Sequence, residues 1–419
     1  MLTGAPRGTK DVLPSSVKAW RYVEQVVRDV CREFGYKEIR TPMFEHTELF
    51  QRGIGDSTDV VDKEMYTFTD RGGRSVTLRP ENTAAVVRSF VENKLYGENL
   101  PFKVFYIGSM FRYDRPQAGR LREFHQFGVE AIGADSAVTD AECIMLAITV
   151  LQRMGLKDLK LKINSVGCTK CRPSYRKALQ DFFRPHITEM CEDCQARIDK
   201  NPMRLLDCKV ETCKKFAVGA PRITDYLCEE CQAHYSKVKE LLTAAGVAYE
   251  EDANLVRGLD YYTKTAFEIQ YNPLGAQSAV AGGGRYDGLV EEIGGPAMSG
   301  IGFAMGLERV IIALEKQGLL PKATDDLDVF AVVPDAKDLP KAFSVVNKLR
   351  EAGLSADIDS MGRSFKTQMK QANRLAAKKV LIFGADELAR GAVVVKNMAD
   401  SKQEEVALDN LLSALQEEM

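Results

Sequence analysis

Apolar side chains recur at intervals of three and four residues in the N-terminal part of the chain, and this spacing predicts helices. The clearest run covers residues 16–34, and its apolar positions are Val17, Trp20, Val23, Val27, Val30, Cys31 and Phe34. A second helical run covers residues 82–93 and follows Pro80, whose fixed φ angle suits the beginning of a helix. Between the two runs, residues 37–42 form an extended segment in which Pro42 favours the edge of a sheet.

The middle of the chain predicts antiparallel strands. Residues 103–113 and 123–132 flank a loop that is punctuated by proline and glycine, as expected of a long hairpin connection. Residues 263–271 and 278–284 flank an Asn-Pro-Leu-Gly turn and predict a second hairpin. The hairpins indicate an α+β domain built on an antiparallel sheet.

Two further segments complete this part of the chain. A glycine-spaced strand at residues 299–305 runs directly into a helix that begins near residue 306. Residues 168–231 are helical, rich in loops and crowded with cysteines, with little strand character. We therefore expect this segment to be an insertion that interrupts the sheet domain.

The pattern changes at about residue 320, after which strands and helices alternate. The strands are expected at residues 327–333, 356–358 and 379–383, and the helices at residues 339–352 and 364–377. This alternation is typical of a separate, parallel α/β domain.

Length and composition fit a folded chain with several parts. At 419 residues the chain is too long for one compact core, and its 45% hydrophobic and 28% charged residues are usual for a globular protein. We expect a sheet domain of residues 1–166 and 253–322, an insertion of residues 167–252 and a C-terminal domain of residues 327–419. The sequence has no membrane-length apolar run and no secretory signal at its start, so a cytoplasmic protein without membrane association is expected.

The net charge of −2 gives no overall basic field, so a nucleic-acid partner would need positive charge gathered locally. Arg363, Lys366, Lys370 and Arg374 are three or four residues apart, and no acid occurs between Ser360 and Ala385. The spacing stacks the four cations on one helix face. Taken alone, such a face more often keeps a protein soluble than it binds RNA.

Eight of the ten cysteines lie in the insertion, at Cys168, Cys171, Cys191, Cys194, Cys208, Cys213, Cys228 and Cys231. Repeated CxxC pairs suit tetrahedral zinc, and eight thiolates would fill two four-coordinate sites. Unligated, reduced thiols are the alternative, whereas redox catalysis is disfavoured because no thioredoxin-like βαβ context surrounds the pairs. Cys31 and Cys143 fall on apolar helical faces and are expected in the core.

Candidate chemistry begins with the strand at residues 123–132. Side chains alternate along a strand, so Phe124, Gln126 and Glu130 share one face, with Gly128 leaving a gap between the polar groups. Arg112, on the preceding strand, could reach the same surface. A solvated face or a simple salt bridge is the plain interpretation; an arginine that grips a phosphate or carboxylate is the functional one.

Three glycine-containing segments follow. Residues 257–262 read Arg-Gly-Leu-Asp-Tyr-Tyr, and residues 281–288 contain three successive glycines that would let a flat ligand or another backbone approach closely. Neither has the spacing of a P-loop or a dinucleotide fingerprint. Arg309 lies in the first turns of the helix that follows residues 299–305, where anions are favoured, although those glycines also suit close helix-on-sheet packing.

In this order, the segments resemble the motifs of class II histidyl-tRNA synthetases of the bacterial type. The first class II motif matches Arg40-Thr41-Pro42 with Phe44-Glu45, the second runs from Phe111-Arg112-Tyr113 to Phe124-His125-Gln126-Phe127, and the third is Gly306-Leu307-Glu308-Arg309. Residues 257–262 and 283–288 match the two histidine-specific segments. The resemblance covers nearly the whole chain, and the Arg-Gly-Leu-Asp-Tyr-Tyr segment is its most specific part.

The resemblance implies roles for individual residues. Arg257 and Arg112 would be catalytic, gripping the α-phosphate of ATP and the histidine carboxylate. Glu81, Thr83 and Gln126 would hold the amino group of histidine, and Glu130 and Tyr262, with Tyr261 nearby, would address its imidazole. Arg309 would hold the terminal phosphate of ATP and Tyr286 would help to shape the ATP site. Arg120 and Arg122 are either pyrophosphate or tRNA contacts or solvated loop residues.

The resemblance also implies an overall reaction and its partners. The chain would be a histidine-tRNA ligase that uses ATP with Mg²⁺ to form histidyl-adenylate, then transfers histidine to the 3′ end of tRNA(His) and releases AMP and pyrophosphate. Residues 327–419 would bind the anticodon, and the first motif would build a homodimer. Structural Zn²⁺ is not implied, because many members of the family lack the full set of cysteines.

One other class of protein shares parts of this pattern. A histidine-sensing regulatory subunit of ATP phosphoribosyltransferase would be a binding module and not a ligase. Such a paralogue should lack the Arg257 segment and the basic C-terminal domain. Both are present in this sequence.

Overall fold

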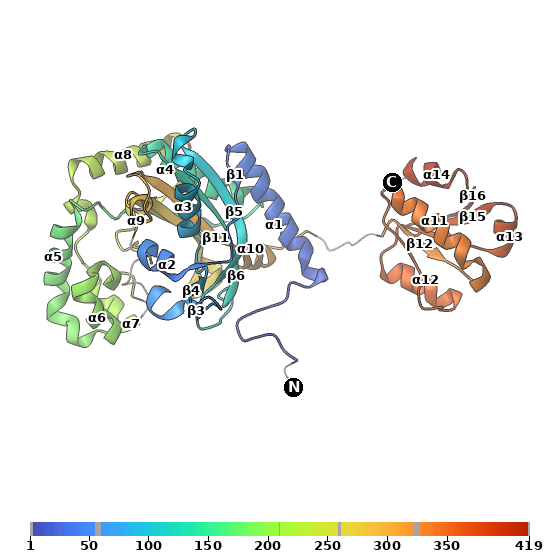
Figure 1. Cartoon of the computed structure of the whole chain (residues 1–419), viewed down its shortest axis with the longest axis horizontal. Helices are drawn as coiled ribbons and strands as arrows, with labels where there is room; N and C mark the ends of the chain where they lie inside the picture. Colours follow the sequence, from blue (N-terminus) through green and yellow to red (C-terminus); the bar gives the residue numbers. More distant parts are fainter. Residues whose placement is uncertain (1–2, 55–59, 209, 259–260, 322–326, 418–419) are drawn as a thin grey trace. The chain divides into compact units, whose positions relative to one another are not determined.

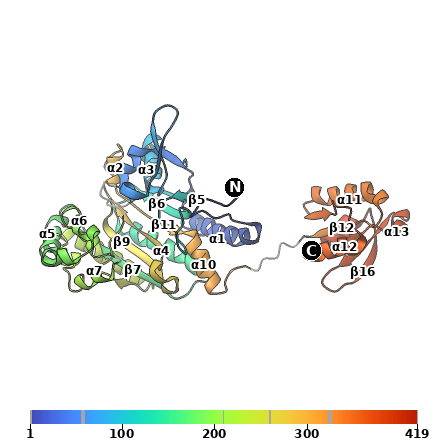
Figure 2. The ribbon, with the colours of Figure 1, turned by 90° about the horizontal axis from the view of Figure 1, so that it is seen from below.

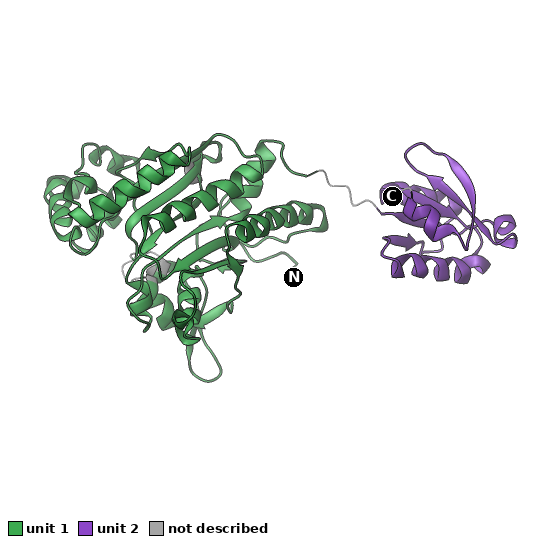
Figure 3. Cartoon of the chain, turned by 90° about the horizontal axis from the view of Figure 1, so that it is seen from above, with its two compact units in different colours: residues 1–321 green, residues 322–419 purple. Residues whose placement is uncertain are grey.

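The chain forms two compact units, residues 1–321 and residues 322–419 (Figures 1 and 3). The computed structural model describes residues 3–54, 60–208, 210–258, 261–321 and 327–417. The cysteine-rich insertion belongs to the first unit by its contacts, so the predicted division of that unit into a sheet domain and an insertion stays a prediction. Among the described residues, no helix combines the length and the apolar character needed to cross a membrane.

The first unit is built on an eight-stranded sheet with the order β1-β5-β6-β11-β10-β9-β7-β8. These strands span Lys37–Glu38, Phe102–Phe111, Glu123–Ile132, Gly300–Gly306, Ala279–Tyr286, Thr263–Tyr271, Leu159–Ser165 and Glu250–Glu251 in that order. All neighbours from β5 to β7 are antiparallel, and only the short edge strands β1 and β8 pair in parallel. Both predicted hairpins and the antiparallel α+β class are confirmed.

Helices cover one face of this sheet and build the main core. They are α1 (Pro14–Glu33), α4 (Ala137–Arg153), α8 (Glu229–Ala244) and α10 (Leu307–Lys316). Val27, Cys31 and Cys143 are fully buried there, against Phe127 and Val129 of the sheet, as the apolar spacing predicted. Figure 2 shows α4 and α10 on one side of the strands and α2 and α3 on the other. The second face is therefore left for the candidate site.

Smaller elements surround this second face. A three-stranded sheet of β2 (Phe44–His46), β4 (Ser75–Leu78) and β3 (Tyr66–Thr69) lies with α2 (Thr47–Ile54), η1 (Val60–Glu64), α3 (Thr83–Glu92), η2 (Leu95–Gly97) and α9 (Leu289–Glu292). The turn η6 (Asn272–Gln277) joins β9 to β10 and instead contacts α10. The helix predicted at residues 82–93 is confirmed. The extended segment predicted at residues 37–42 is a strand only at Lys37–Glu38, and the chain then changes to the smaller sheet.

The insertion is helical, as predicted. Its elements are α5 (Arg172–Phe183), η3 (Arg184–Glu189), α6 (Glu192–Lys200), η4 (Pro202–Leu205), α7 (Glu211–Phe216), η5 (Ile223–Tyr226) and α8. It has a small core of its own, in which Tyr175, Leu179 and Phe183 of α5 pack against Ile198 and Ile223.

The second unit contains a five-stranded sheet with helices. The sheet order is β13 (Ala356–Ile358), β12 (Val329–Val332), β14 (Lys379–Ile382), β15 (Ala392–Asn397) and β16 (Gln403–Ala407). The helices are η7 (Ala336–Asp338), α11 (Leu339–Glu351), α12 (Phe365–Arg374), α13 (Ala385–Ala389) and α14 (Leu411–Glu417). The three predicted strands are parallel, but β15 and β16 are antiparallel, so the sheet is mixed. The connections into these two strands are too short for a parallel crossover.

A buried cluster of polar groups ties the sheet to the helices that cover it. Arg285 of β10 and Asp140 of α4 are both fully buried and form an ion pair. His234 of α8 lies 2.8 Å from the same carboxylate, and Thr265 donates a hydrogen bond to it. Burial acts to raise the pKa of Asp140, but the bonds from His234 and the charge of Arg285 outweigh it and hold the pKa below its ordinary value. The cluster therefore joins α4, α8 and β10 through one charged carboxylate.

Replacing Asp140→Asn should destabilise the first unit by about 3–5 kcal/mol, because the buried guanidinium of Arg285 would lose its counter-charge. Urea unfolding of this variant measures the loss, and Asp135→Asn is the control. Asp135 also lies near Arg285, at 3.7 Å, but is 62% exposed, so that change should cost less than about 1 kcal/mol. A carboxyl with a lowered pKa stabilises above its unfolded pKa of about 4, so the gap between wild type and Asp140→Asn should close as the pH falls below that value. A gap that persists at low pH would contradict this assignment.

Candidate active site

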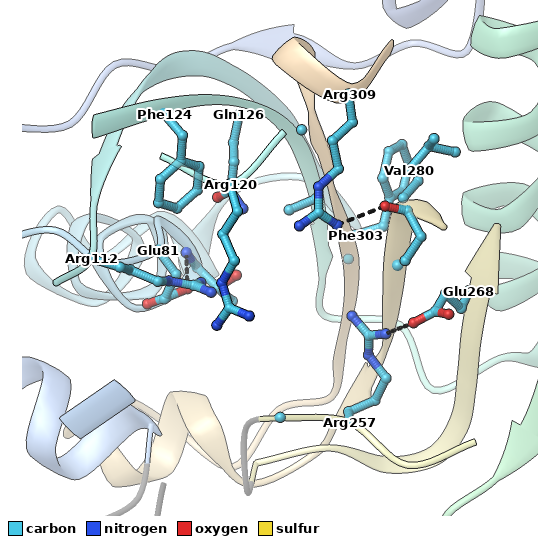
Figure 4. A pocket seen from close by; sticks show the side chains of 18 of the residues that line it. Glu81, Arg112, Arg120, Phe124, Gln126, Arg257, Glu268, Val280, Phe303 and Arg309 are labelled. Carbon is cyan, nitrogen blue, oxygen red and sulfur yellow. Dashed lines mark hydrogen bonds and ion pairs between the residues drawn. The ribbon is translucent and has the colours of Figure 1, made fainter. Parts of the chain in front are cut away.

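A cavity of about 390 Å³ opens on the face of the large sheet that the helices leave free. Strands β6, β9, β10 and β11 contribute lining residues, and so do the segment around Arg257 and the start of α10. Figure 4 shows the guanidinium groups of Arg112, Arg120, Arg257 and Arg309 around the open centre. The wall formed by these four arginines is therefore strongly cationic, and we call this part of the cavity its outer end.

The floor is flat because small residues occupy the strands next to Glu130. Gly302 of β11 pairs with Glu130, and a Cβ atom at this glycine would lie 2.0 Å from the Glu130 carboxylate. Likewise, a Cβ atom at Gly282 of β10 would lie 2.6 Å from the guanidinium of Arg257. These two glycines give the space in which a buried acid and a half-buried arginine lie on the sheet surface.

The acid at the inner end of the cavity is Glu130, which is only 1% exposed. Its carboxylate accepts hydrogen bonds from the hydroxyls of Thr83, at 2.7 Å, and Tyr286, at 2.6 Å. Burial raises the pKa of Glu130 to about 8 although both hydroxyls stabilise the charged form. The solvated-face interpretation of this strand is therefore wrong.

Glu81 and Gln126 lie close to this acid in the lining. The carboxylate of Glu81 accepts the backbone N–H groups of Thr83, at 2.6 Å, and Ala84, at 3.0 Å, and so caps the start of α3. Burial raises its pKa. Among the described residues, the buried amide oxygen of Gln126 has no hydrogen-bond partner. A ligand that donates a hydrogen bond would satisfy it.

Tyrosines form the wall around the acid. Tyr261 and Tyr262 are each 9% exposed, with ring centroids 4.6 Å apart, and Tyr261 meets Tyr286 edge to face at 5.8 Å. The expected gap at Gly128 is wrong. A Cβ atom at this glycine would lie 2.3 Å from the hydroxyl of Tyr106, so the phenol of the neighbouring strand fills the space.

Each cavity arginine is fixed by partners of its own. Arg112 donates to the backbone oxygen of Pro80, at 2.8 Å, and lies over the ring of Phe124. Arg257 forms an ion pair with Glu268, at 3.1 Å, and among the described residues its buried Nε has no hydrogen-bond partner (Figure 4). These contacts hold the guanidinium groups in place before a ligand arrives.

Arg309 shows the electrostatic character of the outer end. It donates to the backbone oxygens of Gly119, at 2.9 Å, and Ala279, at 2.8 Å. Burial lowers its pKa, and the charges of Arg120 and Arg112 lower it further. Mutually repelling cations at close range favour a polyanion between them. Arg122 lies outside this lining, with its guanidinium 3.8 Å from the ring centre of Tyr113.

The structure brings the ten predicted site side chains to this single cavity. They are Glu81, Thr83, Arg112, Gln126, Glu130, Arg257, Tyr261, Tyr262, Tyr286 and Arg309. Leu259 and Asp260 of the same predicted segment lie outside the described residues.

Sequence reasoning missed several residues of the lining, among them Tyr106, Arg204, Asp207 and Glu268. Tyr106 and Glu268 have the right alternation on their own strands, but only the pairing between strands shows that they face the cavity. Arg204 and Asp207 belong to the insertion, and nothing in their local sequence distinguishes them from its other charged residues.

The eight insertion cysteines lie apart from this lining and form two groups of four. In the second unit, Lys366, Lys370 and Arg374 are exposed along α12, as predicted. Arg363 precedes that helix and pairs with Asp359 at 3.0 Å, so it is less available than the stripe implied.

Comparisons with known proteins agree with this geometry. Residues 8–310 match the family described as "Histidyl-tRNA synthetase", and residues 314–418 match "Anticodon binding domain". The chain is 53% identical to a histidine-tRNA ligase of Pelotomaculum thermopropionicum, over 100% of this chain and 99% of the relative. A histidine-tRNA ligase of Caldanaerobacter subterraneus is 54% identical, over 99% of this chain and 100% of the relative.

Solved structures show the same likeness. Apo histidyl-tRNA synthetase of S. aureus is 45% identical, with a TM-score of 0.84 over 99% of this chain and 100% of that one. A Bacillus halodurans structure described as an ATP phosphoribosyltransferase regulatory subunit/histidyl-tRNA synthetase is 23% identical, with a TM-score of 0.66 over 92% of this chain and 100% of that one, and shows a shared fold alone. The chain belongs to the histidyl-tRNA synthetase family.

Proposed function

We propose that the cavity activates L-histidine with ATP to give histidyl-adenylate and then transfers histidine to the 3′ end of tRNA(His). One observation carries the proposal: a buried acid suited to an imidazole and a group of arginines suited to phosphates line the same 390 Å³ cavity. The family supports the same reaction. Because this reaction takes place in the cytoplasm, we propose that the protein is cytoplasmic.

The inner end would select histidine. Glu130 accepts two hydroxyl donors and would take a third hydrogen bond from an imidazole N–H. An apolar amino acid of similar size would leave this acid without that partner, at a cost of about 1–3 kcal/mol or more. Tyr262 would flank the ring. Because the Tyr286 hydroxyl already bonds Glu130, we propose that Tyr286 orients this acid, in place of the ATP role suggested by sequence.

The amino group of histidine would lie beside Gln126, whose amide oxygen needs a donor. Glu81 and Thr83 would complete this site. Both are already engaged, Glu81 with the first turn of α3 and Thr83 with Glu130, so their geometry is fixed before the substrate binds. Such fixed placement is the main way an enzyme lowers the entropy cost of aligning two substrates.

The outer end would stabilise charge on ATP. In the activation step, the histidine carboxylate attacks the α-phosphorus in line, a P–O bond forms, and the bond to pyrophosphate breaks. Arg112 and Arg257 would neutralise the charge that builds on the α-phosphate, and Arg309 would hold the terminal phosphate. Mg²⁺ would enter with ATP as part of that substrate.

In the transfer step, the terminal ribose hydroxyl of the tRNA attacks the carbonyl carbon of the adenylate, and AMP leaves with the bonding electrons. No side chain in the described lining is placed as an obvious base for that hydroxyl. We propose that a phosphate oxygen of the adenylate, held by Arg112 and Arg257, accepts the proton.

The second unit would bind the anticodon stem. Lys366, Lys370 and Arg374 form an exposed cationic row on α12, which would contact RNA phosphates and position the anticodon for base contacts made elsewhere on the unit.

A homodimer is the assembly we propose, with the smaller sheet at the interface. Phe44 of the first class II motif is 55% exposed there and its neighbour Met43 is 54% exposed, while Phe68 on the same sheet is 49% exposed. Large apolar side chains grouped on one surface are typical of an interface. Zn²⁺ held by the insertion cysteines would be structural, since these residues lie outside the cavity lining.

Histidine-dependent ATP–pyrophosphate exchange tests the whole assignment. We expect exchange with histidine alone among the amino acids. Arg257→Met should lower the exchange rate by about 10²–10³, because a charge-stabilising donor is lost while the side-chain length is kept. Arg21→Met, on the exposed face of α1, should leave the rate unchanged. Exchange driven by another amino acid would overturn the proposed function.

Glu130→Gln should weaken histidine binding by about tenfold to 150-fold, since a hydrogen bond to a charged acceptor is worth about 1.5–3 kcal/mol. If histidine binds the carboxylate form, the free protein must lose a proton from a group of pKa about 8 before binding. Calorimetry should then show affinity that rises toward pH 8 in the wild type and is flat over that range in Glu130→Gln. Glu123→Gln, on the same strand but outside the cavity lining, should retain the wild-type pH profile.

Replacing Lys366 and Lys370 together by glutamine should weaken tRNA(His) binding and reduce its dependence on salt by up to about two charges. Filter binding across a range of salt concentrations measures both. The same change at Lys341 and Lys348, on α11, should have little effect, and ATP–pyrophosphate exchange should be normal in both variants. Unchanged tRNA binding in the α12 variant would contradict the placement of RNA on this helix.

A further inference from the structure

The eight cysteines of the insertion are arranged as two separate sets of four. One set is Cys168, Cys171, Cys228 and Cys231, and the other is Cys191, Cys194, Cys208 and Cys213. Within each set, all four sulfurs lie within 4.8 Å of one another. The first set joins the beginning of the insertion to its last helix, and the second set lies between them in the sequence. The fold therefore divides the eight thiols into these two sets of four.

The sulfur spacing fits a four-coordinate metal. Cys168 lies 3.6 Å from Cys171 and 3.8 Å from Cys228, and Cys191 lies 3.8 Å from Cys208. Tetrahedral zinc with Zn–S bonds of about 2.3 Å places its sulfurs roughly 3.8 Å apart. A disulfide would need about 2.05 Å, and all eight thiols are unbridged.

The surroundings of the sulfurs suit thiolates. The backbone N–H of Cys228 donates to the sulfur of Cys171 at 3.1 Å, and that of Cys191 donates to the sulfur of Cys213 at 3.2 Å. Cys171, Cys191 and Cys228 are also the residues that immediately precede α5, α6 and α8. Donated N–H groups and the positive ends of helices both stabilise negative sulfur.

We propose that each set binds one Zn²⁺ and that the two metal sites together fix the backbone of Arg257 and of Tyr262 in the wall of the active site. The metal assignment stands on the cysteines alone. The consequence for catalysis rests on the proposed function, which gives roles to Arg257 and Tyr262 in the cavity.

The first metal site would hold the backbone of Tyr262. Arg172 directly follows Cys171, and its guanidinium donates to the backbone oxygens of Tyr262 and, at 3.1 Å, of Val166. Val166 in turn hydrogen-bonds through its N–H to Lys264, at 2.7 Å. Fixing Cys171 on a metal thus fixes the start of α5 and, through Arg172, the backbone carbonyl of Tyr262.

The second metal site would hold the backbone of Arg257. Arg204 lies in η4, between the ligands Cys194 and Cys208, and donates to the backbone oxygen of Arg257 at 3.1 Å. Its guanidinium also lies 3.2 Å from Asp207, which directly precedes Cys208. Val256 packs in the same small core as Cys194, Cys208 and Cys213. Arg204 therefore repeats, for Arg257, the role that Arg172 has for Tyr262.

Metal content is the first test. The full chain, purified without chelator, should contain two zinc ions per chain by elemental analysis, and X-ray absorption should show four sulfur ligands at about 2.3 Å. Replacing Cys168 and Cys228 by serine, or Cys191 and Cys208 by serine, should each remove one ion, whereas Cys143→Ala should retain both. A folded wild-type protein without metal, or zinc bound by nitrogen or oxygen ligands, would overturn the assignment even if the double variants fail to fold.

Amide hydrogen exchange without substrates tests the coupling. Arg172→Leu and Arg204→Leu should keep both ions but increase exchange in peptides that cover residues 254–266 by at least severalfold. Arg184→Leu is the matched control, because Arg184 belongs to the same insertion but pairs with Asp199, at 2.7 Å. Chelation of the wild type should increase exchange in the same peptides. If all three variants retain their metal and show the same amide hydrogen exchange, the coupling is refuted and the proposed function still stands. If histidine-dependent pyrophosphate exchange fails instead, the proposed function is refuted and these amide exchange measurements remain valid.

Discussion

The candidate site depends on holding a buried acid and several half-buried guanidinium groups so that each has fixed hydrogen-bonding or ionic partners. Glu130 keeps two hydroxyl donors, Arg257 keeps Glu268, and Arg309 keeps two backbone carbonyls. These partners come from the strands of one sheet and from the elements packed on its face. A sheet is suited to this task because its pairing fixes each side chain relative to residues that are distant in sequence.

The same requirement explains the small residues of the floor. Side chains that stand on neighbouring strands are about 5 Å apart, which leaves no room for an acid, an arginine and a ligand unless some positions carry no side chain. Gly302 makes room for Glu130 and Gly282 makes room for Arg257. Gly128 shows the opposite case, since the space above it is taken by Tyr106 and the cavity is closed there. Glycine on a strand thus indicates a close approach but does not say whether a ligand or the protein itself makes it.

The sequence predicted the features that depend on local periodicity. It did not predict the features that depend on how strands pair with one another. The shared face of Gln126 and Glu130 follows from alternation along a single strand, and the site residues were named through a resemblance that spans the chain. Glu268 and Tyr106 could be found only from the register of neighbouring strands. The ion pair of Asp140 and Arg285 joins residues 145 positions apart, and no local pattern signals it. The mixed sheet of the second unit was missed for a similar reason, because alternation of elements says nothing about the direction of the last two strands.

The place of the insertion in the chain accounts for its contact with the site. It leaves the sheet at the end of β7, and the chain rejoins the sheet in the short edge strand β8 and then in β9, both of which are neighbours of β7. Arg257 and Tyr262 lie in sequence between β8 and β9. The insertion contacts both sides of the sheet there. His234 of α8 reaches Asp140 on the helical side, while Arg172 and Arg204 reach the backbone of Tyr262 and Arg257 on the cavity side. The contacts on the cavity side are as well placed as the insertion that supplies them. Its apolar core is small, so two sets of four thiols that bind metal would add ligands that fix the insertion internally.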